Sequence, residues 1–229
     1  DQVLLTDSYN EIKNNKIIKE NIPKLNQHQL DAVKKIKNLA SKKHNNIFLL
    51  DGVTGSGKTE IYLDLISDEI KYGRQSLVLL PEIALSKQFI DRFEKRFNFI
   101  PAIWHSAIPN KEKRITWQKV INGEIKIVIG ARSALFLPFS SLSLIVVDEE
   151  HDTSYKQEDG IIYNARDMAV VRGNLSNAKV ILASATPSLE SIHNTNIGKY
   201  YRIRLPERFG SAVMPRIKII DMRKEKLLS

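Results

Sequence analysis

Runs of apolar residues alternate with helical stretches along most of the chain. Six runs predict buried strands at 47–50, 76–80, 100–104, 125–129, 143–147 and 179–183. The spacing of apolar residues predicts helices at 58–72, 84–97, 110–121, 164–173 and 188–194, and another that begins at Leu25. The strand at 143–147 is almost continuously apolar, which is typical of a parallel strand covered on both faces. The alternation therefore predicts a three-layer α/β domain with a mostly parallel central sheet.

The two ends of the chain do not follow this pattern. Residues 1–24 are polar and rich in Lys and Asn, and we expect a linker or the tail of an upstream domain. The pattern weakens after about residue 198, so the ordered domain is predicted at 25–198 and a connector toward a second lobe at 199–229. The start at Asp1 and the charged end at 223–226 favour a piece of a longer protein.

Composition narrows the class of protein further. The chain has 229 residues, of which 42% are hydrophobic, enough for one large domain with a core. It has no cysteine, which excludes disulfides and thiolate metal sites within these residues. No apolar stretch is long enough to span a bilayer, so we expect no membrane partner and a cytoplasmic location. The net charge of +9 favours a polyanion such as nucleic acid, although a solvated Lys-rich surface gives the same balance.

A phosphate-binding pattern follows the first predicted strand. The segment 52–59, GVTGSGKT, matches G-x-x-x-x-G-K-[ST]. Backbone N–H groups of such a loop, with the N-terminus of the next helix, hold a polyphosphate. We expect Lys58 to reach the β- and γ-phosphates and the Thr59 hydroxyl to ligate Mg²⁺. The predicted nucleotide-binding residues are Gly52, Val53, Thr54, Gly55, Ser56, Gly57, Lys58 and Thr59.

An acidic segment follows the strand at 143–147. It reads Asp148-Glu149-Glu150-His151, and a carboxylate at the tip of a buried strand is costly unless a cation compensates it. We expect Asp148 to hold Mg²⁺ together with Thr59. Glu149 is placed to orient or deprotonate an attacking water, which would turn binding into hydrolysis. Lys58, Asp148 and Glu149 are therefore the predicted catalytic residues.

Two further positions are candidates for coupling the nucleotide to the rest of the protein. His151 would couple the metal site to a neighbouring lobe, or serve as a polar cap. Ser184 and Thr186 follow the strand at 179–183 and could relay the state of the γ-phosphate. The same Ser-Ala-Thr-Pro segment also fits a helix cap.

Together these segments resemble motifs I, II and III of the superfamily-2 helicases. Further segments narrow the resemblance to the primosomal replication-restart DNA helicases, over about residues 25–222. They are Leu79–Leu85, Trp104–Ser106, Gly130–Phe136, Asp148–Gln157, Tyr163–Asp167 and Ser184–Ser191. The resemblance implies the first RecA-like, ATP-binding lobe of an ATP-dependent 3′–5′ DNA helicase. Such an enzyme acts at stalled forks and helps to reload the replicative helicase.

The resemblance also implies roles for individual residues. Gln29 would hydrogen-bond adenine. Four residues would face single-stranded DNA, namely Pro81, Glu82, Arg132 and Ser133. Tyr155 would stack on a base and Lys156 would pair with a phosphate. The chain departs from the family at 161–163, Ile-Ile-Tyr, where an Arg usually precedes the Tyr, and this weakens the expected DNA contact of that loop.

The implied cofactors are ATP and Mg²⁺, and the implied partners are single-stranded and forked DNA, primosome proteins and replicative-helicase loading proteins. A zinc-binding insertion and the arginine finger are expected on a second lobe, so this chain alone is expected to bind ATP weakly and hydrolyse it poorly. Two alternatives stay open. One is a translocase or remodelling motor that does not separate strands, and the other is a module that only binds nucleotide or DNA.

Overall fold

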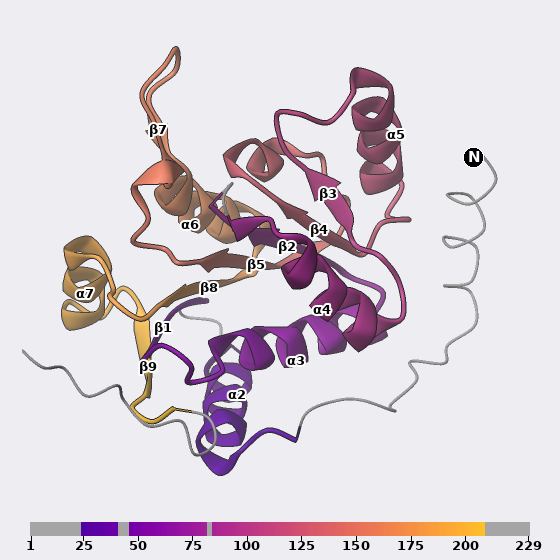
Figure 1. Ribbon diagram of the computed structural model, residues 1–229. Helices are drawn as coiled ribbons and strands as arrows, with labels where there is room; N and C mark the ends of the chain where they lie inside the picture. Colours follow the sequence, from indigo (N-terminus) through magenta and orange to yellow (C-terminus); the bar gives the residue numbers. More distant parts are fainter. Residues whose placement is uncertain (1–23, 41–45, 82–83, 209–229) are drawn as a thin grey trace, which may run out of the picture.

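A computed structural model describes residues 24–40, 46–81 and 84–208 of the protein. Its centre is a seven-stranded sheet in the order β3-β4-β2-β5-β8-β1-β9, in which every neighbouring pair is parallel (Figure 1). The strands are β1 (Ile47–Gly52), β2 (Gln75–Leu79), β3 (Ala102–Trp104), β4 (Ile127–Gly130), β5 (Leu142–Asp148), β8 (Lys179–Ser184) and β9 (Tyr201–Leu205). A two-stranded hairpin pairs β6 (Lys156–Gln157) with β7 (Tyr163–Asn164).

Helices cover both faces of the sheet. One face packs against α2 (Gln27–Ala40), α3 (Lys58–Lys71) and α4 (Lys87–Phe97), and its core includes Ile36, Ile61 and Phe93. The other face packs against α5 (Asn110–Ile121), α6 (Ala165–Ser176) and the 3₁₀ segments η3 (Arg132–Phe136) and η4 (Thr153–Tyr155). The last helix, α7 (Leu189–Asn196), lies beside the sheet at the left of Figure 1. The predicted three-layer α/β fold is therefore confirmed.

The order of the strands brings distant segments of the chain to one edge. Strands β5, β8 and β1 are neighbours, so their last residues, Asp148, Ser184 and Gly52, lie at the same edge of the sheet. Strands β2, β4 and β3 lie on the other side of β5 and end at Leu79, Gly130 and Trp104. In open α/β sheets ligands bind at the carboxyl ends of the strands. The edge is thus divided into two halves that meet at β5.

All six predicted strands are present, with boundaries shifted by up to two residues. The helix predicted from residue 84 begins instead at Lys87, because the Ser86 side chain accepts a hydrogen bond from Phe89 N (3.3 Å) and caps it. The boundary expected at 198 is too early. Strand β9 pairs with β1, and the Arg202 guanidinium contacts the Asp51 carboxylate at 2.7 Å, so this segment belongs to the sheet. Within the described ranges, no helix is long and apolar enough to cross a membrane.

Candidate functional site

The loop between β1 and α3 has the backbone that a phosphate cradle needs. Gly55 and Gly57 have φ angles of 78° and 82°, in the left-handed region that favours glycine. A Cβ on Gly52 would lie 2.5 Å from Ser56 Oγ and would displace that hydroxyl. The buried Ser56 Oγ has no hydrogen-bond partner among the described residues, which leaves it available to a ligand oxygen. The Lys58 ammonium donates to Gly52 O at 2.8 Å, across the mouth of the loop.

The Gln29 side chain, to which the resemblance assigns an adenine contact, has protein partners in this structure. It is buried, and its Nε2 donates to Ser56 O in the phosphate-binding loop at 3.0 Å. Its Oε1 accepts from Asn26 N, while Asn26 Oδ1 accepts from Gln29 N, both at 2.9 Å. This reciprocal pair is a capping box at the start of α2. In this structure the amide therefore joins α2 to the loop, and both of its ends are occupied by protein.

The two predicted magnesium ligands are linked by a residue that the sequence had not singled out. Tyr62, on α3, is fully buried and donates from its hydroxyl to Asp148 Oδ2 at 2.9 Å. The same hydroxyl is hydrogen-bonded to the Thr59 side chain. Asp148 Oδ1 accepts from Glu149 N at 3.1 Å. Tyr62 thus fixes Asp148 relative to Thr59 from one turn further along the helix, a spacing in which i and i+3 share a face.

Burial raises the pKa of the Asp148 carboxyl, and the negative charge of Glu149 raises it further. The Tyr62 hydrogen bond and the positive charge of Lys58 act in the opposite direction. Burial, together with the charge of Asp148, also raises the pKa of Tyr62 well above its ordinary value, so its phenol remains a neutral donor. A buried carboxylate with these surroundings is stabilised by a cation, which is the environment that a metal ligand needs.

Replacing Tyr62 with phenylalanine is expected to weaken magnesium binding by about tenfold, because it removes the group that orients a metal ligand. The measurement is a Mg²⁺ titration of the binding of a fluorescent ATP analogue. Tyr72→Phe is the matched control, since Tyr72 lies at the end of the same helix and is 71% exposed. An unchanged Mg²⁺ midpoint in Tyr62→Phe would show that Tyr62 only packs.

The residues predicted to couple the motifs contact one another. His151 Nδ1 lies 2.7 Å from Ser184 Oγ and 3.6 Å from the Glu149 carboxylate. Ser184 Oγ also accepts from Thr186 N at 3.0 Å. Glu149 has a φ of 47°, a conformation that costs free energy in a non-glycine residue and that recurs at functional sites. The ends of β5 and β8 are therefore joined through a histidine that contacts the candidate catalytic glutamate.

Glu150 has a role that sequence reasoning missed. Its side chain is fully buried, and its carboxylate accepts hydrogen bonds from Ser188 N (2.7 Å), Ser188 Oγ (2.9 Å) and Ser191 Oγ (2.9 Å). The Arg166 guanidinium of α6 lies 3.4 Å away. Ser188 is the N-cap of α7, so this acidic residue attaches both helices to the end of β5. The signal in the sequence was a Ser-x-x-Ser pair at a helix start, which can receive a buried carboxylate.

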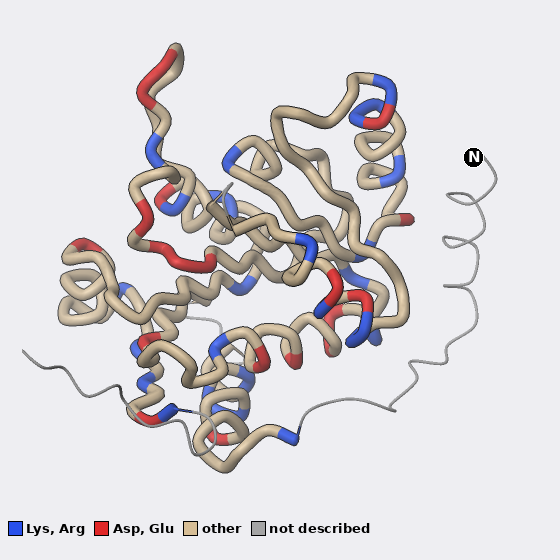
Figure 2. The backbone as a smooth tube through the Cα atoms, viewed as in Figure 1, with Lys and Arg blue, Asp and Glu red and all other residues tan. Residues whose placement is uncertain are grey.

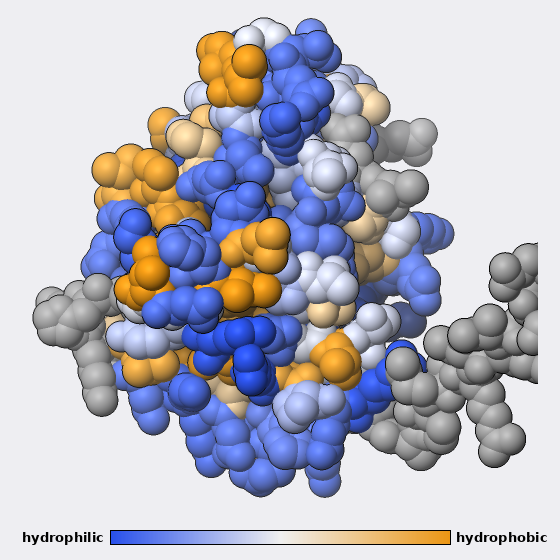
Figure 3. All heavy atoms as spheres, turned by 90° about the vertical axis from the view of Figure 1, so that its left-hand side faces the viewer, coloured by the Kyte–Doolittle hydropathy of each residue, from blue (hydrophilic) through white to orange (hydrophobic). Residues whose placement is uncertain are grey.

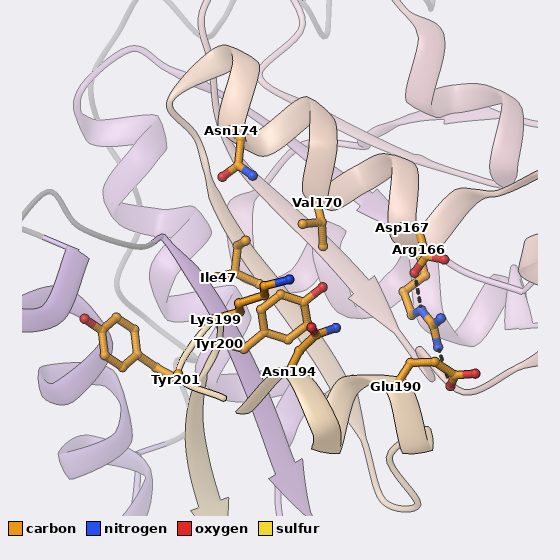
Figure 4. A pocket seen from close by; sticks show the side chains of 11 residues that line it. Ile47, Arg166, Asp167, Val170, Asn174, Glu190, Asn194, Lys199, Tyr200 and Tyr201 are labelled. Atoms are coloured by element: carbon orange, nitrogen blue, oxygen red, sulfur yellow. Dashed lines mark hydrogen bonds and ion pairs between the residues drawn. The ribbon is translucent and has the colours of Figure 1, made fainter. Parts of the chain in front are cut away.

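Arg166 also lines a hollow of about 800 Å³ between α6, α7 and β9. Its side chain lies between Asp167 and Glu190 there (Figure 4). The lining contains Ile47, the first residue of β1, and no residue of the loop at 52–59. The hollow is therefore separate from the nucleotide site.

The other half of the edge carries the segments predicted to face DNA. Pro81, Arg132 and Lys156, from three different segments, line one cavity of about 320 Å³. Arg132 Nη1 donates to Lys156 O at 2.7 Å, which joins η3 to the hairpin. Ser133 is exposed beside it, while Glu82 lies outside the described residues. In Figure 2 the acidic segment after β5 separates this region from the nucleotide half.

Tyr155 lines the same cavity but does not expose its ring, so the prediction that it stacks on a base is wrong for this structure. The side chain is 1% exposed. Its hydroxyl lies 3.0 Å from Leu79 O and 2.6 Å from Asp148 O, within donating distance of both carbonyls. Tyr155 therefore joins the end of β2 to the end of β5. The exposed apolar residues of this loop are Ile161 and Ile162, at 81% and 73%, on the hairpin that projects at the top of Figure 3.

The residues present fit ATP and Mg²⁺. Glycines stand where a Cβ would clash, the buried Ser56 Oγ has no partner among the described residues, and the Lys58 ammonium lies against Gly52 O in the loop. Thr59 and Asp148 are hard oxygen ligands, which Mg²⁺ commonly combines with substrate phosphates and water. The described residues contain no group of three His, Cys, Asp or Glu side chains that could hold a metal ion. The donor set thus suits a metal shared with a bound triphosphate.

A glycine loop after β1, an acidic end on β5 and hydroxyls at the end of β8 define a P-loop nucleotide-binding domain of the RecA-like type. The chain belongs to the DEAD/DEAH box helicase family, whose model matches residues 26–195. It is 52% identical over 206 residues to the replication restart protein PriA of Rickettsia conorii, covering 90% of this chain and 31% of the relative. It is 40% identical over 227 residues to PriA of Bacillus subtilis, covering 97% and 28%.

Solved structures share the fold at lower sequence identity. RecG bound to a three-way DNA junction matches with a TM-score of 0.60 and 23% identity, over 92% of this chain and 26% of that one. The helicase MrfA bound to DNA matches with a TM-score of 0.55 and 18% identity, over 88% and 29%. The chain spans less than a third of the length of each of these relatives and structures.

Proposed function

We propose that this chain is the ATP-binding lobe of an ATP-dependent 3′–5′ DNA helicase that acts in replication restart. One observation carries the proposal. The nucleotide residues and the exposed basic segments lie at the same edge of one sheet, and Tyr155 connects them by contacting both Asp148 O and Leu79 O. A change at Asp148 on binding or loss of the γ-phosphate would thus be transmitted directly to the DNA-facing half.

The names of the relatives support the biological setting. Replication restart proteins from several bacteria match most of this chain at 40–52% identity. We infer that the partners are single-stranded and forked DNA, primosome proteins and the proteins that load the replicative helicase. A protein with these partners would work in the bacterial cytoplasm, where the chromosome lies.

The geometry suggests what each residue does. Lys58 would exchange its bond to Gly52 O for the β- and γ-phosphates. Thr59 and Asp148 would hold Mg²⁺, which when bound neutralises charge on the phosphate oxygens. The backbone of Glu149 is in the left-handed region, and its carboxylate would orient the attacking water. His151 and Ser184 would pass the change from β5 to β8.

The chain alone is expected to hydrolyse ATP slowly even when DNA is added. Motors of this type place an arginine finger on a second lobe, and such a finger contributes about 10³–10⁵ in rate. The measurement is phosphate release by this chain with and without single-stranded DNA, with Glu149→Gln as the background. Fast DNA-stimulated release by the unsubstituted chain would contradict this division of the site between two lobes.

A further inference from the structure

The two tryptophans of this chain lie together at the outer edge of the sheet. Trp104 ends β3, and Trp117 lies on α5. They line a hollow of about 340 Å³ together with Lys113, Arg114 and Gln118. The site is separate from the nucleotide loop and from the cavity that contains Arg132.

Close backbone contacts hold this hollow beside the segment predicted to face DNA. Ala131 N donates to Trp104 O at 3.0 Å, and a Cβ on Gly130 would lie 2.4 Å from the same oxygen. Only glycine therefore allows β3 and the start of η3 to approach so closely. On the other side, the Lys113 ammonium donates to Ser106 O at 2.8 Å and ties α5 to the loop after β3. Backbone contacts thus connect the hollow to the segment that contains Arg132.

Several large apolar side chains of α5 are exposed. Trp117 is 45% exposed, and Ile115 and Ile121 are 45% and 49% exposed. Around them the helix carries four basic residues and one acidic residue, which are Lys111, Lys113, Arg114, Lys119 and Glu112. The exposed Arg114 guanidinium has no ion pair or hydrogen bond with another described residue. An exposed indole surrounded by cations, with one free guanidinium, matches the chemistry of a base and its phosphate.

We propose that this hollow, formed by Trp104, Lys113, Arg114, Trp117 and Gln118, binds single-stranded DNA by stacking an unpaired base on Trp117 while Arg114 contacts a flanking phosphate. The proposal rests on the proposed function and extends the DNA path from Arg132 to the edge strand. Stacking on an indole requires a base free of its duplex neighbours, which selects single strands over duplex DNA. The cationic rim favours a polyanion over an apolar protein partner.

The chain provides its own reporter, because both of its tryptophans line the hollow. Titration with oligo-thymidine should quench the tryptophan fluorescence. In Trp117→Ala the dissociation constant measured by anisotropy of a labelled oligonucleotide should rise about tenfold, while Trp117→Phe should bind nearly as the unsubstituted chain does. In Arg114→Ala the slope of log affinity against log salt should fall by about 0.7, the value for one phosphate on a single strand.

Matched controls separate this effect from general loss of charge or aromatic surface. Tyr72→Ala removes an aromatic that is 71% exposed at the end of α3, before β2 begins, and Lys34→Ala removes an exposed cation from α2. Neither should change binding. Equal unfolding midpoints for the unsubstituted chain and Trp117→Ala would confirm that the variant folds.

Each other outcome has a definite meaning. DNA binding without quenching, or with no loss in Trp117→Ala, overturns this inference and leaves the proposed function standing. No DNA binding by the unsubstituted chain overturns both. If the tryptophan fluorescence falls as protein concentration rises but does not change with oligonucleotide, the hollow is a self-association surface and the inference is overturned.

Discussion

Lys58→Ala is expected to weaken the binding of an ATP analogue by this chain by about 30-fold or more. The reason is that the substitution removes a buried ammonium that we expect to bind phosphate oxygens, and truncating one partner of such a charge pair costs about 2–5 kcal/mol. The lysine is preorganised, since its ammonium already lies 2.8 Å from Gly52 O at the mouth of the loop. In the longer helicase that we propose, the same change should abolish ATP-driven unwinding and spare DNA binding. The measurements are nucleotide titration of the chain and strand separation by the longer protein.

The control lies in the same helix. Lys71→Ala removes a lysine from the other end of α3, where its side chain is 57% exposed and pairs with Asp68. It should leave nucleotide binding unchanged, because exposed ion pairs contribute little and this one is far from the loop. If Lys58→Ala retained both nucleotide binding and unwinding, the proposed mechanism would be wrong.

The features that could be predicted from sequence are those encoded by contiguous residues. The loop at 52–59 and the acidic segment after β5 are local patterns whose chemistry follows from spacing alone. Runs such as 143–147 predicted the parallel sheet. A strand that is buried on both faces has apolar residues at successive positions, without the alternation of apolar and polar residues seen in a half-exposed strand. Their meeting at one edge then followed from topology.

The contacts that sequence reasoning missed involve residues whose surroundings come from distant parts of the chain. Tyr155 looked like an exposed loop aromatic, but it is buried by its contacts with β2 and β5. Gln29 donates to Ser56 O in the phosphate loop, 27 residues away, a contact that its local sequence does not show. Strand β9 is short and carries two arginines, so its pattern is weak, and its place in the sheet is set by pairing with β1. Local patterns cannot show such contacts, since the partners are distant in sequence.

Glu150→Ala is expected to destabilise the fold by about 3–5 kcal/mol, because it removes one member of a buried charged network. The carboxylate caps α7 through Ser188 N and Oγ and accepts from Ser191 Oγ, all within 2.9 Å. Without it, the Arg166 guanidinium, whose side chain is 9% exposed, loses its buried carboxylate partner and keeps the Ser188 hydroxyl (2.7 Å), Asp167 and Glu190. The free energy of unfolding from urea titration gives the measurement. Glu150→Gln should cost less, about 1–2 kcal/mol, since it keeps one acceptor oxygen.

The adjacent glutamate provides a stringent control for this prediction. Glu149 has the same side chain in the same acidic segment, but it is 45% exposed, and its carboxylate approaches His151 Nδ1 at 3.6 Å. Glu149→Ala should therefore change the free energy of unfolding by about 0.5 kcal/mol or less, as is usual for a surface site. The two substitutions should have opposite profiles: Glu149→Ala should impair hydrolysis in the longer helicase and leave the fold intact, whereas Glu150→Ala should lower stability first. Equal stability losses at the two positions would mean that the buried network does not hold α6 and α7 to the end of β5.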